Sequence, residues 1–369
     1  MHLSRIELVN FKNIPQAEMA FSEKVNCILG NNGAGKTTLL DAIYYLAFCK
    51  SFFNPIDSQN IRHGEDFFVI DGHFEINGET HRIFCGQKRN EKKRFRKDKK
   101  EYARLADHIG FIPLVMIAPS DTQLITEGSD VRRKFMDGII AQYDPAYLDT
   151  LMQYNRQLAQ RNAMLKHLWA EGRRPDETTF EVFDEQLHAL GTEIFNKRKQ
   201  FLDSYLPIFS SFYTAVCADS ERVHITYESQ LNEGSLIDLL KASRQNDMRA
   251  QYTTRGIHKD DLIFEIGDGY AMKKFGSQGQ QKSFAVALKL AQFDYLKQVK
   301  LKKPILLLDD VFDKLDDQRV AALMRLVSED HFGQIFITDA NLHRVPDLFE
   351  GANVPLNKYL VDSGNVKPL

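Results

Sequence analysis

A glycine-rich segment from Gly30 to Thr38 carries residues that could bind phosphate groups. It reads Gly-Asn-Asn-Gly-Ala-Gly-Lys-Thr-Thr, a glycine loop followed by a lysine and a hydroxyl residue. In such a loop the backbone N–H groups point at phosphate, Lys36 neutralises the β- and γ-phosphates, and the Thr37 hydroxyl binds Mg²⁺. The sequence therefore predicts a site for ATP and Mg²⁺. Its expected nucleotide contacts are Gly30, Asn31, Asn32, Gly33, Ala34, Gly35, Lys36, Thr37 and Thr38.

Two adjacent acids provide the second group of candidate residues. Asp309 and Asp310 directly follow the apolar run 305–308, which is typical of a central strand in a parallel sheet. Ligands of open α/β sheets bind at the carboxyl ends of the strands. We expect Asp309 to bind Mg²⁺ and Asp310 to act as general base toward water, with Lys36 as its catalytic partner. Acids that merely end a strand are the alternative, and the phosphate loop argues against it.

A third segment, 275–282, opens an expected helix with Ser277, Gln278 and Gly279. Serine is a good helix cap, and a helix N-terminus attracts anions, although a plain cap is the simpler interpretation. The segment is similar to the signature motif of the ATP-binding-cassette superfamily. There, the signature serine and glycine of one protomer contact the γ-phosphate held by the other. The resemblance implies an ATP-dependent homodimer in which these three residues complete the nucleotide site.

Several elements must position these residues. The apolar run 25–29 predicts a buried strand before the phosphate loop, and helical spacing follows it. Other expected strands cover 3–11, 114–117 and 335–338, and the alternating runs 67–76 and 80–85 predict a hairpin. This pattern indicates an α/β fold.

The middle of the chain differs in character. Apolar residues recur at helical spacing over 147–168 and again over 183–209, with a polar Gly-Pro break between them. Neither stretch sustains the heptads of a long coiled-coil arm. We expect an inserted helical lobe. The predicted segments are 1–134 with the phosphate loop, 135–250 as the lobe, and 251–369 with the signature segment and the paired acids.

Composition excludes some classes of protein. The 369 residues carry a formal charge of −2, so nucleic-acid binding would depend on local basic patches. Four scattered cysteines without a CxxC pair disfavour a metal cluster or a disulfide framework. The N-terminus lacks the apolar core of a signal peptide, and the longest apolar stretch is too short to span a bilayer. We expect a cytoplasmic protein without a membrane partner.

Three stretches resemble the RecF family of recombination mediators, a relative of SMC-type heads. They are 118–137, 255–262 and 307–316, and the resemblance covers essentially the whole chain. It implies an ABC/SMC-type P-loop ATPase head with an inserted helical lobe. It also implies a slow, DNA-stimulated ATPase that dimerises with ATP on duplex DNA and on single/double-strand junctions. Such a protein aids RecA loading at single-strand gaps through RecO and RecR, in recombinational repair, replication restart and the SOS response.

The resemblance adds two site residues and leaves two positions open. Asp316 matches the loop that reaches across the dimer, and Gln123 is a candidate for the metal-contacting glutamine. After Ser51-Phe52 the family usually has an arginine, whereas this chain has Phe53-Asn54, so that contact is not carried over. Thr338-Asp339 replaces the histidine of transporter ATPases, so no γ-phosphate-sensing histidine is assigned.

Other polar groups have two interpretations each. The run Lys88–Lys100 holds nine Lys or Arg residues around Phe95, which suits either DNA contact or a solvated hairpin tip. Arg132 and Arg133 could contact phosphate or an acid. His258, near Asp260 and Asp261, is more typical of a structural histidine than of a metal ligand. A P-loop phosphoryl-transfer enzyme, such as a kinase, and an ABC-type motor of another complex remain the rival functions.

Overall fold

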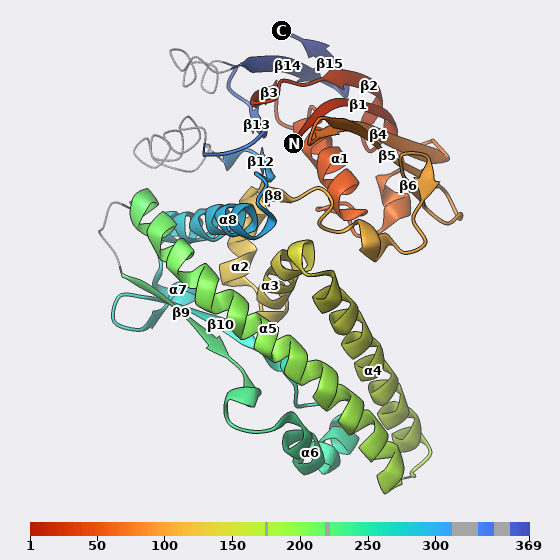
Figure 1. Ribbon diagram of the computed structural model, residues 1–369, viewed down its shortest axis with the longest axis vertical. Helices are drawn as coiled ribbons and strands as arrows, with labels where there is room; N and C mark the ends of the chain where they lie inside the picture. The colour runs from red at the N-terminus through yellow and green to blue at the C-terminus, as the bar shows by residue number, and fades with distance from the viewer. Residues whose placement is uncertain (174–175, 218–221, 312–330, 343–354) are drawn as a thin grey trace. The chain divides into compact units, whose positions relative to one another are not determined.

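The computed structural model of the chain describes residues 1–173, 176–217, 222–311, 331–342 and 355–369 (Figure 1). Its contacts divide the chain into two compact units. The first comprises residues 1–121, 211–218 and 282–369, and the second comprises 122–210 and 219–281. Each unit therefore assembles segments that are far apart in the sequence. The expected borders after residues 134 and 250 stay predictions.

In the described part of the first unit, the strands form two six-stranded sheets. The antiparallel sheet has the order β2-β1-β4-β5-β6-β7, with β1 His2–Phe11, β2 Ile14–Ala20, β4 Phe67–Ile76, β5 Glu79–Lys88, β6 Arg94–Lys97 and β7 Lys100–Glu101. The other sheet has the order β15-β14-β3-β13-β12-β8, with β3 Val25–Leu29, β8 Leu114–Ile117, β12 Ile305–Leu308, β13 Ile335–Asp339, β14 Leu356–Asp362 and β15 Asn365–Pro368. All its neighbouring strands run parallel except β14 and β15.

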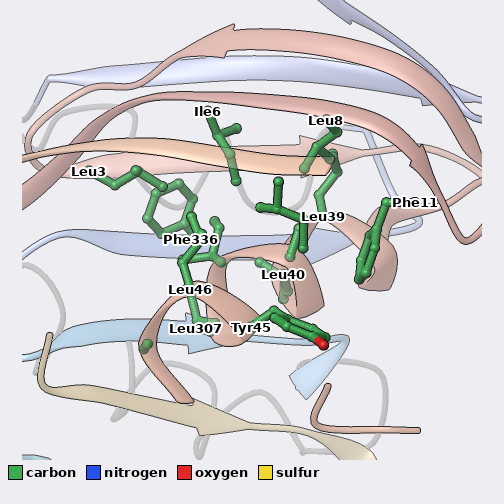
Figure 2. Packing of buried hydrophobic residues seen from close by; sticks show 14 of the residues in the cluster. Leu3, Ile6, Leu8, Phe11, Leu39, Leu40, Tyr45, Leu46, Leu307 and Phe336 are labelled. Carbon is green, nitrogen blue, oxygen red and sulfur yellow. The ribbon is translucent and has the colours of Figure 1, made fainter. Parts of the chain in front are cut away.

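Helix α1, Lys36–Phe48, packs between the two sheets. Figure 2 shows its side chains Leu39, Leu40, Tyr45 and Leu46 between strand β1 and residues of β12 and β13. All of these labelled side chains are buried, so the helix joins both sheets into one apolar core. The N-terminus of α1 is thereby fixed at the carboxyl ends of the parallel strands, where the sequence predicted the nucleotide.

The second unit is mainly helical. Its helices are α2 Gln123–Thr126, α3 Ser129–Tyr143, α4 Pro145–Ala170, the greater part of α5 Glu177–Cys217, α6 Leu236–Ala250 and α7 Met272–Phe275. Helices α4 and α5 run antiparallel, since Asp144 pairs with Lys197 near one end and Arg161 pairs with Asp184 near the other. A three-stranded sheet, β11-β10-β9, completes the unit with β9 Val223–Glu228, β10 Asp261–Ile266 and β11 Tyr270–Ala271.

Most expected elements of the first unit are confirmed. The hairpin 67–88 turns at Asn77-Gly78, and β8, β12 and β13 lie where the apolar runs predicted them. The signature segment opens α8, Gln278–Lys300. Strand β9 was missed, because its alternating pattern lies inside a stretch interpreted as helical. No helix in the described ranges is long and apolar enough to cross a bilayer.

Candidate nucleotide site

The phosphate loop connects β3 to α1 in a conformation that requires glycine. Gly30 has φ 150°, and a Cβ there would lie 2.2 Å from the Val361 carbonyl oxygen of β14. Gly35 caps α1 with φ 119°. The buried Lys36 ammonium donates to the carbonyl oxygens of Gly30 and Asn31, at 2.9 and 3.2 Å. The loop therefore surrounds one cation at a helix N-terminus, an arrangement that binds phosphate.

The predicted metal ligands are brought together across 272 residues of sequence. The Thr37 hydroxyl donates to both carboxylate oxygens of Asp309, at 2.9 and 3.1 Å. The Thr338 hydroxyl also donates to Asp309, at 2.9 Å, and accepts from the backbone N–H of Asp310 at 2.9 Å. Thr338, which the sequence analysis left without a role, thus links the two aspartates. Its position at the carboxyl end of a buried strand was the available signal.

The environment of these acids suits a divalent cation. Burial raises the pKa of Asp309, while hydrogen bonds from Thr338 and Thr37 act in the opposite direction. A hydroxyl and a buried carboxylate in contact are hard oxygen ligands of the kind that Mg²⁺ prefers. Within the described residues, the buried Oδ1 atom of Asp310 has no hydrogen-bond partner. This carboxylate oxygen is therefore not engaged by another group of the described chain.

Asn13 is a site residue that the sequence analysis did not single out. Its side chain donates to the Ala34 carbonyl oxygen at 3.2 Å and accepts from the Thr38 hydroxyl at 2.8 Å. The Ala34 carbonyl also accepts from Gly364 N–H at 2.9 Å. The phosphate loop is consequently held from the β1–β2 turn and from the β14–β15 turn. An amide directly after an opening strand was the only sequence signal.

Near the loop, the partly exposed Lys12 forms an ion pair with the buried Asp41 of α1, at 2.6 Å. Asp41 also accepts from the Ser51 hydroxyl at 2.6 Å and from Phe52 N–H at 2.7 Å. The Lys12 ammonium lies over the exposed Phe53 ring at 5.5 Å. Phe53-Asn54, where the family arginine is missing, is therefore anchored to the first strand and to α1.

The start of α8 forms a reciprocal cap. Gln280 N–H donates to the Ser277 hydroxyl at 3.2 Å, and the Gln280 side chain accepts from Ser277 N–H at 2.6 Å. This is a capping box, so Ser277 caps α8, as the simpler interpretation predicted. Its contact with phosphate stays a prediction. Ser277 and Gln278 are exposed, and Gly279 is partly exposed. A helix start with an exposed hydroxyl leaves room for an anion from outside the chain.

Two further predicted contacts stay predictions. Gln123 is exposed at the first residue of α2, where the chain passes from the first unit into the second. Asp316 lies outside the described residues. The roles of both residues stay predictions that await a test.

The remaining candidates are structural within the second unit. Arg132 forms a two-pronged ion pair with Asp261, at 2.6 and 2.8 Å, and Arg133 donates to the Asp260 carbonyl oxygen at 2.7 Å. The Asp260 carboxylate pairs with Arg198 at 2.8 Å. These arginines therefore serve acids of their own unit. Across the described ranges, no cluster of three or more His, Cys, Asp or Glu side chains could hold a metal ion.

The basic run is only partly available to a ligand. Phe95 is buried in the core, so its ring is not available to a nucleic acid. The Lys93 ammonium turns inward, pairs with Asp57 at 2.8 Å and donates to the Cys49 carbonyl oxygen at 2.6 Å. The exposed cations of the run include Lys92, Arg94 and Lys100. The segment is thus a hairpin with a structural inner face and a basic outer face.

Comparison with known proteins identifies the family of this chain. The model of the RecF/RecN/SMC N terminal domain matches residues 2–350. A Bacteroides fragilis protein named DNA replication and repair protein RecF is 50% identical over 371 residues, which cover 100% of this chain and 99% of the relative. A Flavobacterium johnsoniae protein of the same name is 51% identical over 344 residues, covering 93% of this chain and 95% of the relative.

The chain belongs to the RecF family. Its fold is similar to the solved structure of the recombination mediator protein RecF-ATP in the RecFOR pathway, with a TM-score of 0.89 and 28% identity over 100% of this chain and 97% of that one. An SMC head domain from Pyrococcus furiosus, at a TM-score of 0.60 and 17% identity, shares the fold, covering 100% of this chain and 96% of that one. The expected ABC/SMC-type ATPase head is confirmed for this RecF-family chain.

Proposed function

We propose that this protein is an ATP-dependent DNA-binding switch of recombinational repair. It binds ATP with Mg²⁺, closes as a homodimer on duplex DNA and on single/double-strand junctions, and aids RecA loading at single-strand gaps through RecO and RecR. Slow, DNA-stimulated hydrolysis then opens the dimer. The family membership and the ATP-bound form of a solved relative support this assignment.

One observation carries the ATP part of the proposal. The Thr37 hydroxyl lies 2.9 Å from an Asp309 carboxylate oxygen, beside the phosphate loop. These two side chains would hold Mg²⁺, which supplies charge neutralisation to the phosphates when bound. Lys36 then binds the β- and γ-phosphates, and Asp310 accepts a proton from the attacking water. Residues 30–38 supply the backbone N–H donors.

The dimer part of the proposal depends on Ser277. Ser277 and Gln278 are exposed at the start of α8, and the capping box with Gln280 fixes the Ser277 side chain. A kinase needs no second anion site of this kind. An ABC motor of another complex would share it, and the full-length similarity to RecF proteins argues against that rival. With Gln278 and Gly279, Ser277 would contact the γ-phosphate of the opposite protomer.

A binding series on DNA tests the whole proposal. Duplex, single-stranded and gapped DNA are titrated with protein in the presence of Mg²⁺, with ATP, with a slowly hydrolysed ATP analogue, and without nucleotide. We expect stable complexes on duplex and gapped DNA only with nucleotide, and a dimer in sedimentation under the same conditions. Nucleotide-independent binding, or a monomer at saturating nucleotide, would contradict the switch.

Replacing Lys36 with alanine is expected to abolish ATP binding. The ammonium is the only cation that the described phosphate loop contains, and loss of a buried charge-assisted contact costs on the order of 3 kcal/mol, or more than ~100-fold in affinity. Equilibrium titration with a fluorescent ATP analogue measures the effect. Lys24→Ala, on the turn before β3, is the matched control. Unchanged nucleotide affinity in Lys36→Ala would contradict the assignment of the loop 30–38 as the phosphate-binding loop.

Neutralising the outer face of the basic run is expected to weaken DNA binding in a salt-dependent way. The variant changes Lys92, Arg94 and Lys100 to glutamine and leaves the Lys93–Asp57 ion pair intact. If each cation contacts phosphate, the slope of log affinity against log salt falls by roughly 2–3 units. An unaltered slope would show that the run is a solvated hairpin.

A further inference from the structure

A second basic surface lies in the helical unit, on the last turn of α6 and the loop that leads from it to β10. The loop 249–259 denotes this segment below. Its exposed residues are Arg249, Tyr252, Arg255 and Lys259. The Lys259 ammonium lies over the Tyr252 ring at 4.9 Å, and that ring is 46% exposed. The segment 249–259 contains no acidic residue. In the part of the chain that the structure describes, no ion pair joins these three cations to a carboxylate.

The acids that border this loop are occupied by other cations. Asp247 pairs with the buried Arg161 at 2.6 Å, and Asp260 pairs with the buried Arg198 at 2.8 Å. Both carboxylates are buried, with side chains 0% exposed. Arg161 also pairs with Asp184, and Arg198 also pairs with Asp137. Asp247 and Asp260 therefore have cationic partners inside the unit and are not the partners of the outward cations of the loop.

Hydrogen bonds to neighbouring elements hold the backbone of the loop. Thr253 N–H donates to the Asn162 side chain at 2.7 Å, and the Thr254 hydroxyl donates to Asp247 at 2.6 Å. Gly256 N–H donates to the Gln230 side chain at 3.0 Å, and Arg198 donates to the Ile257 carbonyl oxygen at 2.9 Å. The backbone is thus tied to α4, to α5 and to the turn after β9.

The centre of the loop is fixed by Tyr154 and His258. The Tyr154 hydroxyl and His258 Nδ1 are 2.9 Å apart, and His258 Nε2 lies 3.0 Å from the Thr253 carbonyl oxygen. Burial lowers the pKa of His258 to about 4, so the ring is neutral near pH 7. Gly256 has φ 131°, and a Cβ there would lie 2.6 Å from the Tyr154 hydroxyl oxygen. Only glycine allows this packing.

A rigid loop that presents unpaired cations has little ordering entropy to lose when it binds an anion. Three cations on one short segment match a repeating anion such as a phosphate backbone. The relatives of this chain are named as DNA replication and repair proteins, which makes DNA the polyanion to consider.

We propose that the loop 249–259 binds the phosphate backbone of DNA through Arg255 and Lys259. This proposal rests on the proposed function and names a contact surface for it in the helical unit. The contact positions the protein on DNA and carries no base specificity, because cations on phosphate oxygens do not read base edges.

The test compares three variants of the full-length protein on duplex DNA with Mg²⁺ and a slowly hydrolysed ATP analogue. In Arg255→Gln with Lys259→Gln, we expect the slope of log affinity against log salt to fall by roughly 2. Arg255→Lys with Lys259→Arg keeps both charges and should keep the slope. Arg104→Gln with Lys134→Gln makes the same change in net charge at exposed cations that pair with Asp107 and Asp130, and should also keep it.

The outcomes separate the two levels of proposal. If wild type binds DNA with nucleotide and the double glutamine variant keeps the wild-type slope, the loop is no DNA contact and this proposal is overturned. A variant that loses binding to a protein partner while its DNA slope is unchanged overturns it too. If wild type itself shows no nucleotide-dependent DNA binding, the proposed function fails. If the slope of log affinity against log salt also falls in Arg255→Lys with Lys259→Arg, the effect is structural and the phosphate contact is rejected.

Discussion

Replacing Asp310 with asparagine is expected to slow ATP turnover by roughly 10²- to 10⁴-fold, the usual contribution of a positioned general base. Nucleotide affinity should change little, because the phosphate contacts come from the loop 30–38. An asparagine keeps the shape of Asp310 and an oxygen that accepts hydrogen bonds, but its amide cannot take up the proton of the attacking water. The ATP-bound form, and with it the DNA complex, should therefore persist.

This substitution is a clean test because the backbone tolerates it. Asp310 has φ 45°, in the left-handed region, and asparagine is the non-glycine residue that enters that region most readily along with aspartate. Turnover is measured at saturating ATP and Mg²⁺. Asp309→Asn should instead weaken Mg²⁺-dependent nucleotide binding, and Asp362→Asn, at an exposed strand end, serves as the matched control. Wild-type turnover in Asp310→Asn would show that another group takes the proton.

Ser277→Arg is expected to prevent ATP-dependent dimerisation while ATP binding by the monomer survives. The hydroxyl of the capping box is lost, and a long side chain fills the exposed helix start. A symmetric dimer loses two such contacts. At about 1.5–3 kcal/mol for each hydrogen bond to a charged group, the dimer weakens by about 3–6 kcal/mol, or roughly 10²- to 10⁴-fold.

Sedimentation with Mg²⁺ and a slowly hydrolysed ATP analogue measures this effect, and hydrolysis and stable DNA binding should fail with the dimer. Ser204→Arg, at an exposed position of α5, introduces the same side chain elsewhere and should dimerise normally. Equal dimerisation of Ser277→Arg and wild type would reject the cross-protomer contact. Loss of nucleotide binding by the Ser277→Arg monomer would show that the residue acts within its own chain, as in a kinase-like site.

The sequence predicted those parts of the site whose chemistry depends on local spacing. The phosphate loop needs its glycines, Lys36 and Thr37 within one turn, and the buried strand before Asp309 is visible as four apolar residues. Their meeting was predictable because both lie at carboxyl ends of parallel strands. Asn13 and Thr338 were not assigned, because their roles depend on contacts with residues far along the chain. No periodic pattern records such contacts.

The basic run shows a second kind of limit. Charge alone suggested an exposed segment. However, Lys93 forms an ion pair with Asp57, and Phe95 is buried in the apolar core. A strand alternates its side chains between two faces, so half of a basic run on a strand can be structural. Strand β9 was missed because its signal is weak. Its six alternating residues lie between the long helices α5 and α6, whose helical periodicity dominates this part of the sequence.

The central strand β3 has a consequence for how the protein is made. Its two neighbours are β13 and β14, so both ladders use residues from 335 onward, and Gly364 N–H reaches the Ala34 carbonyl oxygen. While a ribosome is still synthesising the middle of the chain, Val25–Leu29 has emerged without either of its hydrogen-bonding partners. The phosphate loop therefore lacks these contacts until residues 335–364 have left the exit tunnel. Such distant pairings fold slowly, and an incomplete translation product lacks a nucleotide site altogether.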